Sequence, residues 1–216
     1  MNTRRYKYGL SLVEMLIVIG VIALLATMVV GIASRVDNQA KERLVKSTVT
    51  ILGAALEEFR DYGYTYKSSI YAEFDFPLDV VEPISGPLPP DILTATLAQE
   101  FGLPVSVESV YAGQTIVHKL EYTSSELLYF FLSRIPECRK ILDEIDSSLI
   151  TDKDDNGYPM KLIIGTEEYS LLRIIDPWDT TLVYDYSNEI ARKTFPVITS
   201  AGPDGIFGTD DDITNR

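Results

Sequence analysis

Carboxylates and glycines crowd together near the C-terminus of this chain. The stretch 200–213, SAGPDGIFGTDDDI, holds four aspartates and three glycines. Clustered carboxylates repel one another unless a cation relieves them. Ca²⁺ takes about six to eight oxygen ligands, and glycines let a loop wrap around the ion. We therefore expect a Ca²⁺-binding loop here, with a solvated acidic tail as the alternative.

A second acidic stretch has the beginning of a calcium-loop pattern. Asp152-x-Asp154-x-Asn156-Gly157 matches the first half of an EF-hand loop. Ile163 stands at the twelfth position, where such a loop needs a bidentate Glu. We therefore expect a turn in this stretch, with a weaker Ca²⁺ site as the alternative.

Another acid lies next to a long apolar segment. Glu14 directly precedes residues 15–33, which are 19 consecutive residues without a charge. A carboxylate at the edge of a lipid bilayer is costly and needs a partner. Two interpretations stay open: Glu14 extends to the lipid headgroups, or it lies near the positive N-terminus that a cut after Gly9 would create.

The composition argues against most catalytic and nucleic-acid functions. A net charge of −13 argues against nucleic acid as the main ligand, because phosphate binding needs basic patches. Cys138 is the one cysteine and His118 the one histidine, so we expect no disulfide framework, Cys/His zinc site or His-based triad. We expect Cys138 to be a spare thiol and His118 to lie in a strand. The chain is not expected to be an enzyme.

The apolar segment is long enough to cross a membrane. As a helix it would span roughly 28 Å, close to the hydrocarbon thickness of a bilayer. Basic residues precede it, and of the 32 acids only Glu14 lies before residue 36. The positive-inside rule then predicts a single-pass protein with a cytoplasmic N-terminus and an external acidic domain. A cleaved secretory signal peptide and a plain signal anchor are the alternatives.

The same helix is predicted to continue beyond the apolar segment. Apolar residues recur there at spacings of 4, 3, 4 and 3: Val45, Val49, Leu52, Leu56 and Phe59. This is one stripe of an amphipathic helix, and Gly63 is a natural end for it. A continuous helix over 11–62 would be roughly 78 Å long, apolar all round in its first half and with one face to cover in its second.

The rest of the chain predicts short helices and strands. Residues 77–91 contain five prolines and predict an extended loop. Thr123-x-x-Glu126 is typical of a capping box at the start of a helix, and a second short helix is expected to begin at Pro136. Segments rich in β-branched and aromatic residues predict antiparallel strands at 160–165, 169–175, 181–186 and 195–199, with a turn at 176–179.

The N-terminal residues resemble type IV prepilins and the pseudopilins of type II secretion. Those proteins have a basic leader, Gly, a large apolar residue, a nearby Glu and an apolar helix, and YKYG-LSLVEMLIVIGVIALLATMVVGIA has these features in order. The resemblance implies cleavage by a prepilin peptidase between Gly9 and Leu10, N-methylation of Leu10, and a role for Glu14 in subunit assembly. It divides the chain into a leader (1–9), a transmembrane and filament-core helix (10–35), and an extracytoplasmic head (36–216) with a variable insertion at 77–150.

Two C-terminal segments resemble the major pseudopilin. DPWDTTLVYDY is similar to its DPWGNPYxY segment, with Asp179 in place of Gly, and SxGPDGxFGTDDDI resembles its calcium loop. The second resemblance implies Ca²⁺ ligands at the matched positions: Asp204, Asp210 and Asp212, with Ser200, Ile206 and Phe207 as weaker candidates. Asp211 is expected to point outward, because it lies between two inward neighbours.

Together the resemblances imply a structural subunit with an α+β fold. A long N-terminal helix, transmembrane in its first half, would pack on a small antiparallel β-sheet head with a calcium-binding C-terminal loop. The subunit would join the helical homo-oligomer of a type II secretion pseudopilus at the inner membrane, with the head in the periplasm. Minor pseudopilins, prepilin peptidase and an inner-membrane assembly platform would be its partners. The alternatives are a type IV pilin or minor pilin of a surface filament for adhesion, motility or DNA uptake, and a signal-anchored enzyme with a metal site.

Overall fold

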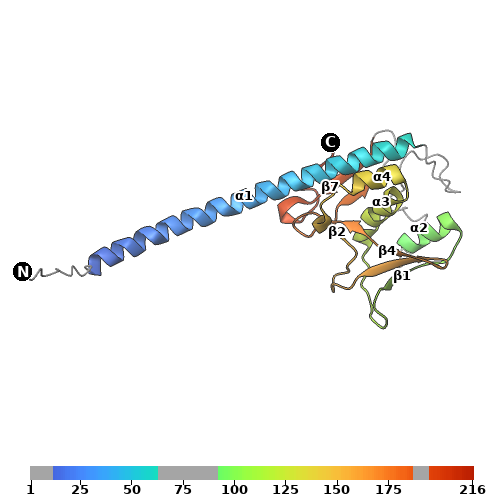
Figure 1. Cartoon of the computed structure of the whole chain (residues 1–216), viewed down its shortest axis with the longest axis horizontal. Coiled ribbons are helices and arrows are strands. Elements are labelled where there is room, and N and C mark those ends of the chain that lie inside the picture. Colours follow the sequence, from blue (N-terminus) through green and yellow to red (C-terminus); the bar gives the residue numbers. More distant parts are fainter. Residues whose placement is uncertain (1–11, 63–91, 187–194) are drawn as a thin grey trace, which may run out of the picture. The chain divides into compact units, whose positions relative to one another are not determined.

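The computed structural model describes residues 12–62, 92–186 and 195–216 (Figure 1). The predicted leader, the cleavage site and the proline-rich loop at 77–91 lie outside these residues. The chain forms two compact units, Met1–Lys41 and Glu42–Arg216.

One helix, α1 (Leu12–Asp61), makes up the described part of the first unit and the beginning of the second. Its sequence contains no proline, so nothing interrupts the backbone hydrogen bonds. The continuous helix predicted over 11–62 is therefore confirmed for the described residues. In the second unit the predicted apolar stripe is buried, with exposed fractions of 0–2% for Val45, Val49, Leu52, Leu56 and Phe59.

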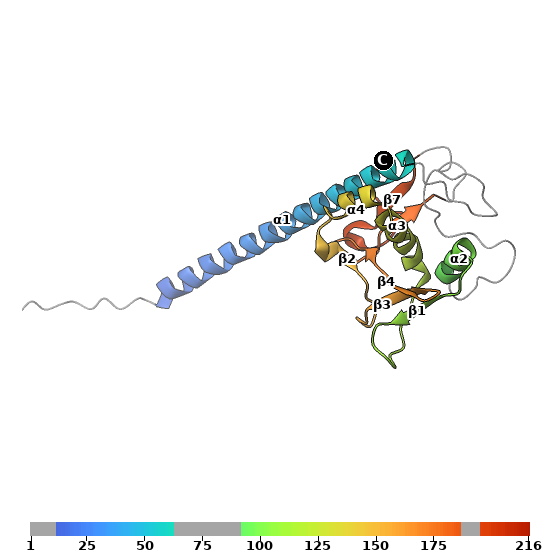
Figure 2. The same ribbon diagram turned by 45° about the vertical axis from the view of Figure 1, so that its right-hand side comes forward.

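Three short helices supply much of the remaining core of the second unit. They are α2 (Ile92–Phe101), α3 (Thr123–Ser133) and α4 (Pro136–Leu142). Pro136 occupies the first turn of α4, where its missing N–H costs no hydrogen bond, so the predicted restart is confirmed. Leu97 of α2 and Phe131 of α3 join the stripe of α1 in one hydrophobic cluster. In Figures 1 and 2 α4 lies beside the C-terminal part of α1.

The strands of the described residues form three small antiparallel sheets rather than one. The first has the order β1 (Val105–Ser109), β3 (Met160–Ile164), β4 (Glu167–Ser170). The second pairs β2 (Ile150–Thr151) with β5 (Arg173–Ile174). The third has the order β6 (Val183–Asp185), β7 (Val197–Ser200), β8 (Ile213–Thr214). The α+β class with small antiparallel sheets is confirmed.

One predicted strand is divided in the structure. The segment 169–175 forms the end of β4 and all of β5, with Leu171 and Leu172 between them. Leu171 is 1% exposed, and its backbone N–H donates to the carbonyl of Met160. The apolar run therefore reflects burial of a corner between two sheets rather than one continuous strand.

The predicted capping box at the start of α3 is wrong. The helix does begin at Thr123, but its N-terminal end has no side-chain cap. Glu126 is fully buried, and its Oε2 lies 2.7 Å from Nε2 of His118. His118 lies in the irregular segment before the 3₁₀ turn η1 (Leu120–Tyr122), not in a strand as predicted. A buried carboxylate needs a polar partner, and the imidazole provides it from outside the helix.

Candidate functional site

Leu12, the first described residue, separates the N-terminal residues for which a role is predicted. Gly9 and Leu10 lie outside the described part of the chain. Glu14 lies inside it, as the acidic residue in the first turn of α1. A carboxylate there interacts favourably with the partial positive charge at the N-terminal end of a helix. The structure thus places Glu14 where a negative charge also favours the helix itself.

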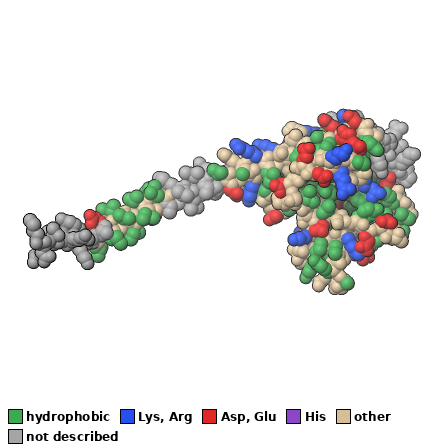
Figure 3. Space-filling model, in the orientation of Figure 1, with side chains coloured by type: hydrophobic (Ala, Val, Ile, Leu, Met, Phe, Trp, Pro, Cys, Tyr) green, Lys and Arg blue, Asp and Glu red, His purple; other side chains and the backbone are tan. Residues whose placement is uncertain are grey.

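The first half of α1 exposes its apolar side chains. From Leu12 to Leu25 the large apolar side chains are 48–81% exposed, and they cover the visible face of this part of the helix in Figure 3. Among the described residues, no helix has the length and hydropathy that a membrane span requires. Within the predicted span 15–33, the side chains of residue 26 and of residues 28–33 lie outside the described set.

The turn at 176–179 is organised by one buried carboxylate. Oδ1 of Asp176 accepts hydrogen bonds from the backbone N–H groups of Trp178 (3.0 Å) and Thr180 (2.9 Å). Asp179 follows with a φ of 67°, in the left-handed region. Gly reaches this region freely, and Asp is one of the few other residues that enter it. The predicted turn is confirmed, and its backbone shape is one that both Asp and Gly can adopt.

The same carboxylate joins this turn to the C-terminal loop, residues 201–212. Oδ2 of Asp176 accepts a 2.8 Å hydrogen bond from the hydroxyl of Ser200, the last residue of β7. The hydroxyl oxygen of Ser200 in turn accepts from the backbone N–H of Gly202. Ser200 is completely buried. The hydroxyl that the resemblance implied as a weaker calcium ligand is therefore already engaged inside the protein.

Two of the three main calcium candidates stabilise the C-terminal loop through backbone contacts. Oδ1 of Asp204 accepts from the N–H of Ile206 at 2.8 Å, and Oδ2 of Asp212 accepts from the N–H of Gly208 at 2.8 Å. The other oxygen of Asp212 is enclosed and has no hydrogen-bond partner among the described residues. Asp210, the third candidate, is exposed.

Asp211 does not point outward as predicted. Its Oδ2 accepts from the backbone N–H of Asp204 at 3.1 Å, across the C-terminal loop, and its Oδ1 accepts from the hydroxyl of Thr209. The hydrogen bond from Thr209 is the largest cause of a lowered pKa of Asp211. The alternation argument failed because residues 207–211 form turns and a bend rather than an extended strand.

The oxygen donors of the C-terminal loop are of the kind that Ca²⁺ prefers. The enclosed oxygen of Asp212 is also suited to such a cation, because a buried carboxylate oxygen without a partner is costly. The carbonyl of Ile206 accepts from the hydroxyl of Thr209 at 3.1 Å. In the described part of the chain, however, no three His, Cys, Asp or Glu side chains are grouped to hold a metal ion.

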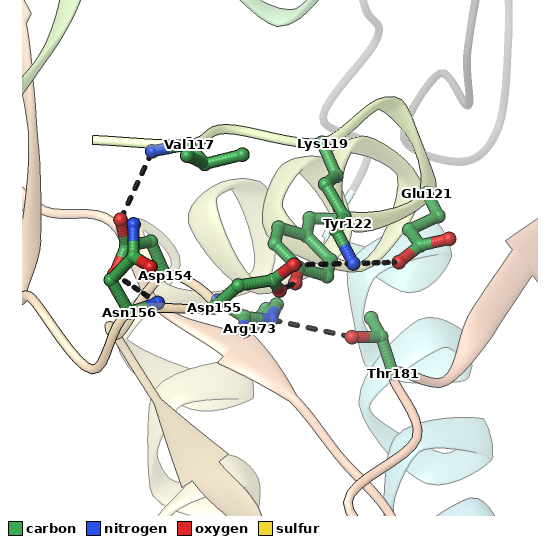
Figure 4. Close-up of polar contacts among 9 residues, drawn as sticks. All are labelled: Val117, Lys119, Glu121, Tyr122, Asp154, Asp155, Asn156, Arg173 and Thr181. Atoms are coloured by element: carbon green, nitrogen blue, oxygen red, sulfur yellow. Dashed lines mark hydrogen bonds and ion pairs between the residues drawn. The ribbon is translucent and has the colours of Figure 1, made fainter. Parts of the chain in front are cut away.

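The second acidic stretch forms a turn, as its first interpretation predicts. Oδ1 of Asp154 accepts from the N–H groups of Asn156 and Tyr158, and Oδ2 accepts from the N–H of Val117 (Figure 4). Both oxygens are therefore used by the backbone of this chain. Asp155 instead contacts Lys119 through a 2.6 Å ion pair. These hydrogen bonds favour a structural role for Asp154 over the role of a metal ligand.

The one cysteine is part of the core. Cys138 is fully buried, and its Sγ donates to the carbonyl of Ala55 on α1 at 3.4 Å. Burial, and after it the charge of Glu58, raise the pKa of the Cys138 thiol to about 11. A thiol in this state is not a nucleophile near neutral pH. This agrees with the expectation that Cys138 has no catalytic role.

Sequence reasoning missed two buried charged residues. Asp176 was seen only as part of a turn, although the sequence Asp-Pro-x-x marks a side chain that can accept from the backbone two residues on. Arg173 was seen only as part of a strand, yet it is 6% exposed. A basic residue within an apolar strand segment was the available signal, because such residues are rarely buried without a purpose.

The comparisons with known proteins concern the N-terminal residues. Residues 4–30 match the prokaryotic N-terminal methylation motif. No curated protein and no solved structure matches the chain. The matched residues include Gly9, Leu10 and Glu14, so these three lie within a recognised motif. The chain therefore carries a type IV prepilin-like methylation motif, which indicates a pilin-like protein processed by prepilin peptidase.

Proposed function

We propose that this chain is a structural subunit of a type II secretion pseudopilus. Prepilin peptidase cuts it between Gly9 and Leu10, and Leu10 is methylated at its new amine. The mature subunit then enters a short periplasmic filament together with further copies and minor pseudopilins. The methylation motif at residues 4–30 is the observation that carries this proposal.

The exposed apolar face of α1 supports the filament-core role. Burying one large apolar side chain contributes about 1.5–3 kcal/mol, so many such side chains favour lipid or neighbouring helices over water. We propose that residues 10–35 first anchor the subunit in the inner membrane, with the N-terminus in the cytoplasm and the head in the periplasm. In the filament the same residues would pack against other copies.

Glu14 is proposed to guide this assembly. A charged carboxylate among apolar side chains needs a partner of opposite charge. At an effective dielectric constant of about 20, opposite charges about 4 Å apart attract by roughly 4 kcal/mol before desolvation costs. The N-terminal amine of a neighbouring mature subunit would supply that charge and so fix the register between copies.

The C-terminal loop supports a pseudopilin over a pilin with a C-terminal disulfide. The chain has one cysteine, so no intramolecular disulfide can close this end. We propose that Ca²⁺ takes that stabilising role, held by Asp204, Asp210 and Asp212. The enclosed, unpartnered oxygen of Asp212 supports this choice. A surface pilin remains the alternative function, and it would share the same processing.

The test of processing is the mass of the mature N-terminus. The natural chain, expressed with a prepilin peptidase, should begin at methylated Leu10. The variant Gly9→Val should remain full length in the membrane, because the residue before the cut must leave the backbone accessible. Normal accumulation of protein that begins at Leu10 in this variant would refute the processing step.

A second pair of variants separates assembly from processing. Glu14→Ala should be cut and methylated normally but should fail to form filaments, as judged by shear release and electron microscopy. Asp37→Ala is the matched control, because it removes an exposed acid of the same helix beyond the methylation motif. Loss of secretion of a reporter enzyme, with surface pili unaffected, would favour the secretion system over a pilus.

A further inference from the structure

Arg173 is a buried cation with few partners. It is 6% exposed, and its Nε donates to the hydroxyl of Thr181 at 3.3 Å (Figure 4). Its Nη1 is enclosed and has no hydrogen-bond partner among the described residues. The ring of Tyr122 covers the guanidinium, with Cζ 3.8 Å from the ring centroid. A guanidinium offers five N–H donors, and the two on Nη1 have no acceptor among the described residues.

The nearby acids do not supply the missing partner. Both oxygens of Asp155 are occupied, Oδ1 by the hydroxyl of Tyr122 and Oδ2 by Nζ of Lys119. Lys119 also pairs with Glu121 at 3.2 Å. Both oxygens of Asp154 accept from backbone N–H groups. Asp155 interacts with Arg173 through its charge, but among the described residues no carboxylate accepts a hydrogen bond from the guanidinium. Burying a donor without an acceptor is costly, so the arrangement lacks a hydrogen-bond acceptor for Arg173.

A cavity of about 580 Å³ opens beside this residue. Its wall comes from separate parts of the chain, including residues 119, 121 and 122, the turn at Asp154 and Asp155, and Gly205 and Phe207 of the C-terminal loop. The volume is within the range of sites for small ligands. Three basic and four acidic side chains line the cavity, so its net charge disfavours an anion with several charges more than one with a single charge.

We propose that this cavity binds a single carboxylate group through Arg173. The planar guanidinium matches a carboxylate in geometry, and the pair forms short, charge-assisted hydrogen bonds. Lys153, an exposed residue in the lining of the cavity, adds a second positive charge. The carboxylate comes either from a small carboxylic acid or from an acidic residue of a second copy of this chain.

The experiment uses the full chain in detergent micelles at fixed ionic strength. Thermal unfolding is followed by the fluorescence of Trp178, the one tryptophan, which lies next to the wall residues Asp179 and Thr180. Sodium acetate should raise the unfolding midpoint in a saturable manner. Acetamide, which has the same shape without the charge, should leave it unchanged, and sulfate should act more weakly than acetate. Equal effects of acetate and acetamide, or of acetate and sulfate, would overturn the proposal.

Variants tie the effect to the cavity. Arg173→Met should abolish the response to acetate, whereas Arg173→Lys should keep a response weakened about tenfold, because lysine lacks the fork of donors. If Arg173→Met fails to fold, Lys153→Glu replaces it, since this exposed side chain is not needed for the core. It should weaken acetate binding several-fold. An unchanged response in whichever of these two variants folds would refute the assignment.

Sedimentation of the same samples distinguishes the two sources of the carboxylate. If acetate disperses self-association in the natural chain but not in Arg173→Met, a second copy supplies the group. If sedimentation does not change while acetate still stabilises the chain, the ligand is a small carboxylic acid. Either result supports carboxylate binding. Processing at Gly9 does not involve Arg173, so failure here is distinguishable from failure of the proposed function.

Discussion

Asp176 and Ser200 are joined by a 2.8 Å hydrogen bond between buried groups, although 24 residues separate them in the sequence. The carboxylate also accepts from the N–H groups of Trp178 and Thr180. One side chain therefore shapes the turn at 176–179 and fixes the start of the C-terminal loop. The turn at 176–179 and the C-terminal loop are thus held together by one buried carboxylate.

Replacing this carboxylate should destabilise the protein strongly. Asp176→Ala leaves two backbone N–H groups and a buried hydroxyl without their acceptor, so we expect a loss of about 2–5 kcal/mol in the free energy of unfolding. Urea unfolding of the full chain in detergent, followed by Trp178 fluorescence, measures it. The control is Asp146→Ala. It removes an exposed carboxylate that accepts from the backbone N–H and the hydroxyl of Ser148, and it should cost about 1 kcal/mol or less. Equal losses in the two variants would contradict the role of Asp176.

Gly202 is predicted to tolerate no side chain. A Cβ at Gly202 would lie 2.3 Å from the backbone carbonyl oxygen of Asp211. Gly202→Ala should therefore displace the C-terminal loop and lower the unfolding midpoint. Gly205→Ala is a matched control, because Gly205 has a similar positive φ but its nearest neighbour for a Cβ is the hydroxyl of Thr180 at 3.5 Å. In both variants the alanine must adopt a left-handed backbone conformation, which costs about 1–2 kcal/mol. The two losses in stability should therefore differ only by the clash with Asp211. A smaller loss in Gly202→Ala than in Gly205→Ala would show that the contact with Asp211 is unimportant.

Asp179 offers a stabilising substitution. Asp179 has a φ of 67°, and a residue other than Gly adopts this value only at a cost of order 1 kcal/mol. Asp179→Gly should therefore raise the free energy of unfolding by up to about 1 kcal/mol, while Asp179→Val should lower it. The urea midpoints of the two variants, compared with the natural chain, test this. A destabilised Gly variant would mean that the side chain of Asp179 makes a contribution larger than the backbone strain.

The stability of the turn at Asp154 should depend on pH. Burial raises the pKa of Asp154, but hydrogen bonds from Val117, Tyr158 and Asn156 outweigh it and lower the pKa below that of an ordinary aspartate. The contribution is therefore complete above the unfolded pKa of about 3.9 and is lost as the pH falls through the lower folded value. Urea midpoints of the natural chain should fall more steeply below about pH 4 than those of Asp154→Asn. Parallel curves for the two proteins would exclude this contribution.

Local periodicity made part of this fold predictable. The buried stripe from Val45 to Phe59 follows from helix geometry alone, because residues three and four positions apart lie on the same face of a helix. The start of α4 is a local signal too, because Pro136 is favoured in the first turn of a helix. The pairing of His118 with Glu126 was not predictable, because a buried carboxylate can find its partner anywhere in the chain. The capping box was the local alternative, and tertiary burial overrode it.

The candidate site shows the same division between local and long-range signals. The methylation motif is a contiguous pattern, so Gly9, Leu10 and Glu14 can be proposed as site residues from the sequence alone. The roles of Asp176, Asp211 and Arg173 depend on residues that are distant in sequence or on turns whose side chains do not alternate. Asp211 was misplaced for this reason, since a strand-like alternation was assumed for a loop that contains positive-φ glycines.

The last prediction concerns calcium. A ligand that binds only the folded state adds RT ln(1 + [L]/Kd), about 2.7 kcal/mol at a hundredfold excess over Kd. The full chain in detergent should therefore unfold at a higher temperature in Ca²⁺ than in EGTA. Asp212→Asn should abolish the difference, because it removes charge from the carboxylate whose Oδ1 is enclosed without a partner. Asp210→Asn should reduce it.

Asp211 provides the discriminating comparison. Its oxygens are used by the N–H of Asp204 and the hydroxyl of Thr209, so Asp211→Asn should lower the unfolding temperature in EGTA as well as in Ca²⁺. Among the described residues, Asp212 uses one oxygen only, to accept from the N–H of Gly208, and the amide oxygen of Asp212→Asn can keep that hydrogen bond. This variant should therefore differ from the natural chain mainly when Ca²⁺ is present. If the natural chain unfolds at the same temperature in both buffers, the loop is a hydrogen-bonded acidic tail and not a cation site. The proposal of a pseudopilin rather than a pilin would then lose its main support.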